Sequence, residues 1–280
     1  MAVDLHLHSN FSDGSATPSE IVELAVETGL TGIALTDHDI LEGIPEARAA
    51  AEANDLQFIA GVEMSVDWQG SAMHLLVYFL EDEEGPLQNK LVAVREGRAS
   101  RNIQIISALQ ANGIDITMAE VASVAGEGSM GRPHFAKVLV DKGVVTTMSE
   151  AFNKWLGTGQ PGYVARTRLD AFEAVELARQ SGAVPVIAHP HTLGLDATDY
   201  AHAFSELADA GLGGIEAYYT EYSQDLREHV AQICTDLGIA ATGGSDFHGT
   251  YKPDIKVGIG LGDLSVSDLA LQHLLEQASR

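Results

Sequence analysis

Two histidines near the start of the chain have the spacing of a metal-binding pair. His6 and His8 lie in the segment 3–9, where apolar and polar residues alternate as in a strand with one buried face. Alternate residues of a strand point to the same side, so both imidazoles face one direction, and Asp13 follows in a short polar loop. Such a set can hold a divalent metal. An isolated pair of this kind could equally be two ordinary strand residues.

The same residue types recur beside the apolar runs that follow. Short runs at 32–36, 57–62, 184–188 and 239–242 predict buried strands. Histidines and acids stand at or just after the ends of these runs: Asp37, His38, Glu63, His189, Asp246 and His248. Chance could place one or two such residues there, but not the whole set, because buried ionisable groups need partners. In a parallel barrel these strand ends form one rim, which is where sites are built.

His74 is the exception to this pattern, because it opens the apolar run 74–80 and does not close it. Either the strand begins earlier than the apolar run, or it runs against its neighbours.

Imidazole and carboxylate ligands without thiolates favour Mn²⁺, Zn²⁺ or Fe²⁺. The candidates exceed what a single ion needs, so we expect two or three ions. Glu63, on a middle strand, is the expected bridge between ions about 3.5–4 Å apart. Such ions lower the pKa of a bound water and offset charge on phosphoryl oxygens. The predicted reaction is therefore metal-assisted hydrolysis, with a phosphoester as the favoured substrate.

The predicted strands alternate with amphipathic helices, which indicates an α/β fold. Thr17 to Glu20 has the sequence of a capping box with proline at the first helical position, and Gly29 ends that helix. We also predict helices over 45–54, 170–181, 198–210 and 222–237, a last strand near Val257 and a helix from Ser267. About seven short apolar strands interleaved with helices are typical of a parallel α/β barrel.

This alternation stops after a long helix predicted over 86–112. From there to about 168, short helical pieces alternate with glycine-rich breaks. We therefore assign 1–99 and 169–280 to the barrel and 100–168 to a mostly helical inserted subdomain. Residues 90–168 hold ten of the 16 Lys and Arg residues but only six of the 40 acids, so an acidic barrel carries one basic insert.

The overall composition excludes several classes of protein. The single Cys234 excludes an internal disulfide framework and a thiolate metal cluster. The net charge of −24 argues against non-specific binding to duplex nucleic acid. No apolar run approaches the roughly 20 residues of a membrane helix. The chain starts directly with a strand, without a charged and then apolar leader, so we expect a cytoplasmic location.

The insert carries candidate phosphate-binding residues. Arg98, Arg101 and Asn102 lie on the long helix, and Arg132 and His134 begin another helix. Guanidinium groups bind phosphate oxygens bidentately, and a helix start adds backbone donors. Each arginine alone could be a solvated surface group, but together they predict an anion clamp that faces the metals. His134 could donate to a phosphate, protonate a leaving group, or be an ordinary histidine of the insert.

The motifs resemble those of the PHP (polymerase and histidinol phosphatase) family. The matching segments follow the family's order along the chain: His6-Leu7-His8, Asp13-Gly14, Thr36-Asp37-His38, Gly61-Val62-Glu63, His74, Ala188-His189-Pro190 and Gly244-Ser245-Asp246-Phe247-His248. The resemblance implies a distorted (β/α)₇ barrel with up to three divalent metals, of which Mn²⁺ is preferred.

The resemblance also implies how the ligands are shared among the ions. One ion would be held by His6, His8, Glu63 and Asp246. The second would be held by Glu63, His74 and His189, and the third by Asp13, His38 and His248. Asp37 would stand behind these ligands and orient one of them, or it would instead cap the helix that follows.

The insert is similar to that of one PHP subgroup, the small bacterial 3′,5′-nucleotide bisphosphate phosphatases, some of which also trim short RNA from the 5′ end. The matching segments are Ser100-Arg101-Asn102 and Gly131-Arg132-Pro133-His134. The resemblance implies a substrate with two phosphates, one cleaved at the metals and one held by the insert. The expected reaction releases the 3′-phosphate of adenosine 3′,5′-bisphosphate to give AMP. His134, His191 or a metal-bound water would assist the leaving group.

Three other functions fit part of this pattern. An L-histidinol-phosphate phosphatase would use the same metals but has no evident use for the basic insert. A metal-dependent amidohydrolase often bridges its metals with a carboxylated lysine, and no predicted strand before the last carries a lysine. A non-catalytic metal-binding or polymerase-associated module should have lost some ligands, and none is missing.

Overall fold

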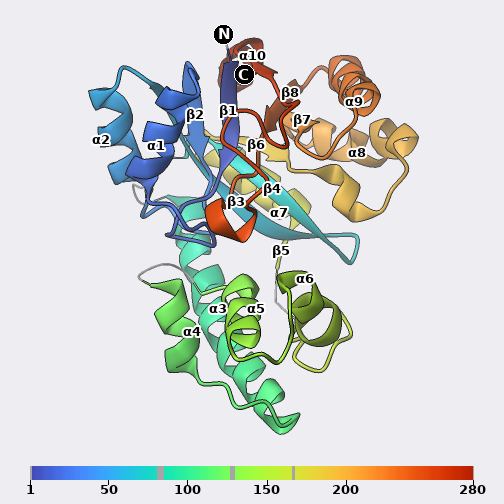
Figure 1. Ribbon diagram of the computed structural model, residues 1–280. Coiled ribbons are helices and arrows are strands. Elements are labelled where there is room, and N and C mark those ends of the chain that lie inside the picture. The colour runs from blue at the N-terminus through green and yellow to red at the C-terminus, as the bar shows by residue number, and fades with distance from the viewer. Residues whose placement is uncertain (1, 81–84, 127–129, 166–167, 280) are drawn as a thin grey trace.

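The computed structural model describes residues 2–279 except 81–84, 127–129 and 166–167. Its centre is a sheet that curls into a nearly closed barrel, with the strand order β8-β7-β6-β4-β3-β2-β1-β9 and with β5 paired to β3 (Figure 1). The strands are β1 (Ala2–Leu7), β2 (Gly32–Leu35), β3 (Gln57–Trp68), β4 (Ser71–Tyr78), β5 (Leu169–Asp170), β6 (Val184–Ile187), β7 (Gly214–Tyr219), β8 (Ala240–Gly244) and β9 (Val266–Ser267). The expected α/β barrel is confirmed.

The strand directions explain the position of His74. β1, β2 and β3 are parallel, and so are β6, β7 and β8, but β4 runs antiparallel to both of its neighbours, β3 and β6. The start of β4 therefore lies beside the end of β3, and His74 pairs with Ser65. β3 does not end near Glu63 as predicted, because its pairing with β4 carries it on to Trp68.

The barrel closes between β1 and the end of β8. The backbone N–H of Asp246 donates to the His6 carbonyl at 2.9 Å, and that of His8 donates to the Phe247 carbonyl at 3.1 Å. Gly244 makes this approach possible, because a Cβ there would lie 2.4 Å from the His6 Cβ and 2.5 Å from its backbone nitrogen. Closure thus brings together the first and last segments of the chain that carry candidate metal ligands.

Helices cover the outside of the barrel. Five of them share one core with the strands: α1 (Pro18–Glu27), α2 (Ile44–Ala53), α7 (Ala171–Gln180), α8 (Tyr200–Asp209) and α9 (Gln224–Leu237). The chain also forms α10 (Leu269–Ala278) and the short turns η2 (Pro190–Leu193), η3 (Ala197–Asp199) and η4 (Gly249–Tyr251). The capping box predicted at Thr17 and Glu20 is formed. A second core joins strand residues to α10, which packs on β8 and β6.

The chain between β4 and β5 forms a helical lobe below the barrel (Figure 1). Its elements are α3 (Pro86–Ala111), α4 (Met118–Ala125), α5 (Arg132–Asp141), α6 (Met148–Ala151) and the π-helical turn η1 (Phe152–Leu156). Residues from Ile105 to Leu156 build a core of their own. The first half of α3 belongs to the barrel instead, since Leu87 and Leu91 pack in the barrel core.

One predicted strand is wrong. The segment near Val257 is a turn, and the last strand is β9, which begins nine residues later. Gly258 and Gly260 have φ values of 77° and 55°, which a strand does not accommodate. Among the described helices, none combines the length and apolar character needed to cross a membrane.

Candidate metal centre

Imidazole nitrogens and carboxylate oxygens converge at the barrel rim in three groups of possible metal ligands. The atoms of each group lie within 4.8 Å of one another. The groups are His6, His8, Glu63 and Asp246; His8, Asp13, His38 and His248; and His38, Glu63 and His74. The first is the set implied for one ion. The second is the set implied for another ion, with His8 added.

Glu63 lies at the centre of these groups and is buried. Its Oε1 is 2.7 Å from His74 Nδ1 and 2.9 Å from His189 Nε2. Its Oε2 lies between 3.0 and 3.3 Å from three further nitrogens: His8 Nε2, His6 Nε2 and His38 Nδ1. Burial would raise the pKa of the Glu63 carboxyl, but the imidazoles around it hold that pKa well below its usual range. Each oxygen thus faces a different side of the cluster, as a bridging carboxylate requires.

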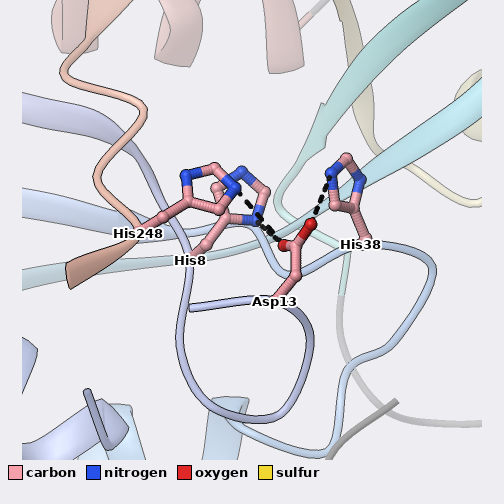
Figure 2. A group of neighbouring side chains, drawn as sticks. All are labelled: His8, Asp13, His38 and His248. Atoms are coloured by element: carbon pink, nitrogen blue, oxygen red, sulfur yellow. Dashed lines mark ion pairs between the residues drawn. The ribbon is translucent and has the colours of Figure 1, made fainter. Parts of the chain in front are cut away.

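Asp13 has the corresponding place in the second group, where it points toward three histidines (Figure 2). Its Oδ1 is 3.3 Å from His248 Nε2 and 3.8 Å from His8 Nδ1, and its Oδ2 is 3.8 Å from His38 Nε2. Burial lowers the pKa of His38 to about 4, so this imidazole is neutral at pH 7, the form that coordinates a metal.

The chemistry and spacing of these groups fit a divalent ion. Ligand atoms about 2.1 Å from one ion lie roughly 3–3.5 Å apart, close to the separations observed here. Three buried atoms, His8 Nδ1, Asp13 Oδ1 and His38 Nδ1, have no hydrogen-bond partner among the residues that the structure describes. Leaving a buried polar atom unsatisfied costs about 1–3 kcal/mol. A cation bound among these atoms would remove that penalty.

Two of the candidate ligands have uncommon backbone conformations. His189 has a φ of 27° and Asp246 a φ of 57°. Non-glycine residues in this region are strained by about 1–3 kcal/mol and concentrate at functional sites. The His189 backbone N–H points at the Glu216 carboxylate, 2.7 Å away, which helps to hold this conformation.

Glu216 is a supporting residue that the sequence interpretation missed. It is fully buried on β7, and its Oε1 lies 2.9 Å from His6 Nδ1. A carboxylate that accepts the Nδ1 proton leaves Nε2 free for a metal and fixes the orientation of the ring. The signal available in the sequence was an acid inside the apolar run 214–217, where a charge needs a partner.

Replacing Glu216 by glutamine is expected to weaken metal binding by about 10- to 100-fold, the usual effect of losing such a support. Metal titration followed by activity should show lost turnover at low Mn²⁺ and recovery at high Mn²⁺. Glu206→Gln, at an exposed position on α8, is the matched control. Unchanged metal affinity in the Glu216 variant would contradict this role.

Asp37 also stands behind the ligands. It accepts hydrogen bonds from the Ser9 N–H at 2.8 Å, the Ser9 hydroxyl at 2.6 Å and the Ser12 hydroxyl at 2.5 Å. It therefore ties down the loop that leads to Asp13. The alternative, a cap for the following helix, is not realised, because the N-cap of α2 is Gly43.

The cluster opens into a cavity of about 440 Å³ between the barrel rim and the helical lobe. Pro133, Met148 and Phe152 of the lobe line it opposite the ligands. His191 also lines it, with its Nδ1 3.3 Å from the Tyr222 hydroxyl. Burial lowers the pKa of His191. A volume of this size suits a small organic ligand.

The predicted phosphate-binding residues of the lobe do not gather in this cavity. Ser100 and Arg101 line a second cavity of about 410 Å³, together with Lys90 and Arg168. The Asn102 side-chain amide donates to the Met130 carbonyl at 3.0 Å. The side chain of Arg98 lies outside the described residues.

Arg132 and His134 lie at the start of α5 and make contacts within or near the lobe. The Arg132 guanidinium packs 5.9 Å from the ring centres of both Phe152 and Tyr163. His134 is buried and accepts the Gly131 backbone N–H at its Nδ1, 3.0 Å away. Arg132 thus supports the Phe152 ring that lines the metal cavity.

Comparisons with known proteins agree with this geometry. The profile of the PHP domain matches residues 4–157. A 3′,5′-nucleoside bisphosphate phosphatase from Chromobacterium violaceum is 36% identical over 88% of this chain and 87% of its own length. A 5′-3′ exoribonuclease from Haemophilus influenzae is 30% identical over 88% of this chain and 89% of its own. A solved structure from Bifidobacterium adolescentis, provisionally described as a metal-dependent phosphoesterase, superposes with a TM-score of 0.87 at 28% identity, covering 98% of this chain and 96% of its own.

Proposed function

This chain belongs to the PHP domain family and is a metal-dependent phosphoesterase, and we propose that it removes the 3′-phosphate of nucleoside 3′,5′-bisphosphates. Adenosine 3′,5′-bisphosphate would give AMP and phosphate. The observation that carries the proposal is a buried histidine–carboxylate cluster that opens into a cavity with an apolar wall on the lobe side. The relative that is 36% identical over most of the chain carries the name of this activity.

We propose that the cluster holds two or three divalent ions, preferably Mn²⁺, with Zn²⁺ and Fe²⁺ as alternatives. The ligands would be the nine residues deduced from the sequence, with Glu63 shared between ions. When bound, such ions supply an activated water and offset charge on phosphoryl oxygens. The protein's own part is to hold its ligands in place through Glu216 and Asp37 and to exclude bulk water from the buried rim.

The lobe, residues 100–168, would bind the rest of the substrate. The ring of Phe152, against which the Arg132 guanidinium packs, offers an aromatic face on which a nucleobase or ribose can pack. We propose that Ser100 and Arg101, which line the second cavity and not the metal cavity, take the phosphate that is not cleaved. Asn102 and His134 would hold the lobe segments on which the wall of the metal cavity is built. Of the two histidines proposed as leaving-group acids, His191 lines the metal cavity.

Short 5′-phosphorylated oligoribonucleotides are a second candidate substrate class. The relative that is 30% identical over most of the chain is named a 5′-3′ exoribonuclease. The basic cavity with Lys90, Arg101 and Arg168 would suit the further phosphates of such a chain.

The purified enzyme with Mn²⁺ is expected to convert adenosine 3′,5′-bisphosphate to AMP and phosphate in equal amounts. Its kcat/KM should exceed that for AMP or L-histidinol phosphate by at least about tenfold, since a second phosphate contact with a charged group contributes about 1.5–3 kcal/mol. Chromatography of the products and a phosphate assay measure both quantities. Arg101→Gln should reduce this preference and spare the monophosphates, whereas Lys154→Gln, at an exposed site of the same lobe, should not. Equal hydrolysis of all three substrates would contradict the proposed substrate.

A further inference from the structure

Lys252 places a positive charge at the mouth of the metal cavity. It follows the η4 turn, and that turn comes directly after the segment of candidate ligands that ends at His248. Among the described residues that line this cavity, it is the only lysine or arginine. Its side chain is 39% exposed, and its Nζ donates to Asp246 Oδ2 at 2.7 Å. The cationic residues predicted for the lobe are not part of the same described lining.

The two oxygens of Asp246 have different surroundings. Oδ1 faces the cluster, 3.5 Å from His6 Nε2 and 3.4 Å from His8 Nε2. Oδ2 faces away from it and accepts two hydrogen bonds, from Lys252 and from the Tyr219 hydroxyl at 2.9 Å. The Tyr219 hydroxyl already orients the Asp246 carboxylate. Orienting Asp246 therefore does not by itself explain why the ammonium group of Lys252 lies here.

The ammonium group has hydrogen-bonding capacity left over. It carries three N–H donors and no acceptor, and Asp246 takes one of them. A phosphomonoester brings close to two negative charges at neutral pH, into a cavity that already holds the carboxylates of Asp13, Glu63, Asp246 and Glu221. A fixed cation at the rim offsets this charge, and it does so more strongly in the transition state, where charge accumulates on the phosphoryl oxygens.

We propose that Lys252 is a catalytic residue whose ammonium group, anchored by Asp246, donates hydrogen bonds to a non-bridging oxygen of the phosphoryl group being transferred. This inference rests on the proposed phosphoesterase reaction but not on the identity of the nucleotide. Lys252 keeps its proton throughout. The oxygen of water forms a bond to phosphorus and gives up a proton, the ester P–O bond breaks with its electron pair on the leaving oxygen, and that oxygen takes up a proton to become a hydroxyl. Lys252 only stabilises the charge on the oxygens that stay on phosphorus.

Three variants separate this role from a purely orienting one. Lys252→Gln removes the charge, and Lys252→Arg keeps it. Tyr219→Phe removes the other donor to the same Asp246 oxygen without changing any charge. If Lys252 acted only through Asp246, Lys252→Gln and Tyr219→Phe would have the same consequences for metal content and for turnover.

The experiment measures five quantities in the Mn²⁺-saturated proteins: bound metal per chain, thermal midpoint, the inhibition constant of inorganic phosphate, and kcat and KM for adenosine 3′,5′-bisphosphate. In Lys252→Gln we expect bound metal within about twofold of wild type, phosphate inhibition weakened by about tenfold, and kcat lowered by about 100-fold, the usual effect of losing one such donor. Lys252→Arg should recover most of both losses, and Tyr219→Phe should leave phosphate inhibition unchanged.

Phosphate inhibition that is equal in wild type and Lys252→Gln at full metal occupancy would overturn the inference, even if the Lys252→Gln variant had lost stability. So would identical profiles of Lys252→Gln and Tyr219→Phe. The proposed substrate fails in a different way: wild-type enzyme would leave the bisphosphate intact while it still binds phosphate through Lys252, which direct titration of phosphate by calorimetry would show.

Discussion

Replacing Glu63 by glutamine is expected to lower phosphoester hydrolysis by about 10³-fold, equivalent to roughly 4 kcal/mol in the activation barrier. The two Glu63 oxygens lie within 3.3 Å of five histidine nitrogens on opposite sides of the cluster. An amide offers one oxygen and no charge. The variant should therefore lose the bridge between ions and bind fewer metals per chain.

Elemental analysis of the dialysed protein, together with kcat at saturating Mn²⁺, tests this prediction. Glu23→Gln, at an exposed position on α1, is the matched control and should behave as wild type. A Glu63→Gln variant with full metal content and a loss of less than about tenfold would show that the cluster does not depend on a shared carboxylate.

Replacing Gly244 by alanine is expected to unfold or loosen the rim and abolish metal binding. The added Cβ would meet the His6 Cβ at 2.4 Å, the His6 backbone nitrogen at 2.5 Å and Asp4 Oδ1 at 2.9 Å. All three atoms belong to strand β1, which cannot move without separating it from β8. Overpacking of this kind costs about 1–3 kcal/mol or more, which in a protein of this size lowers the thermal midpoint by about 2–4 °C per kcal/mol.

Calorimetry of the metal-free and Mn²⁺-loaded proteins measures the effect, since only an intact rim gains stability from the metal. Gly97→Ala provides the contrast. That glycine lies in α3 with nothing within 4 Å of an added Cβ, so the change should stabilise the protein by up to about 1 kcal/mol. Metal-dependent stabilisation of Gly244→Ala equal to that of wild type would contradict the proposed closure.

The sequence predicted the fold well where the signal was local. Apolar runs, a capping box and glycine stops placed β1, β2, β6 and α1 within one or two residues. The direction of β4 could not be decided, because an apolar run reads the same for either direction, and only its pairing with β3 and β6 settles it. The strand expected near Val257 failed because two close glycines turn the chain there.

The candidate site was predictable to the extent that its residues stand at strand ends. That pattern identified most of the imidazoles and carboxylates that converge at the rim, whereas His74 opens its apolar run and Asp13 lies in a loop. The pattern did not identify Glu216 or Lys252. Glu216 lies inside a strand and not at its end, and Lys252 follows an irregular turn, where no sequence period indicates which side chains point inward. The contacts of Arg132 depend on rings that are 20 and 31 residues away along the chain, and a lone arginine gives no sign of such partners.

The uninterrupted course of α3 determines how the barrel and the lobe can move. This helix has 26 residues, so it is about 39 Å long. Its first turns are embedded in one core, at Leu87 and Leu91, and its last turns in the other, at Ile105 and Leu109. Because each end of α3 is packed into a core, a movement of the lobe away from the barrel has to bend this helix or break some of its hydrogen bonds. Any change in the separation of the lobe and the barrel rim therefore costs the energy of distorting α3.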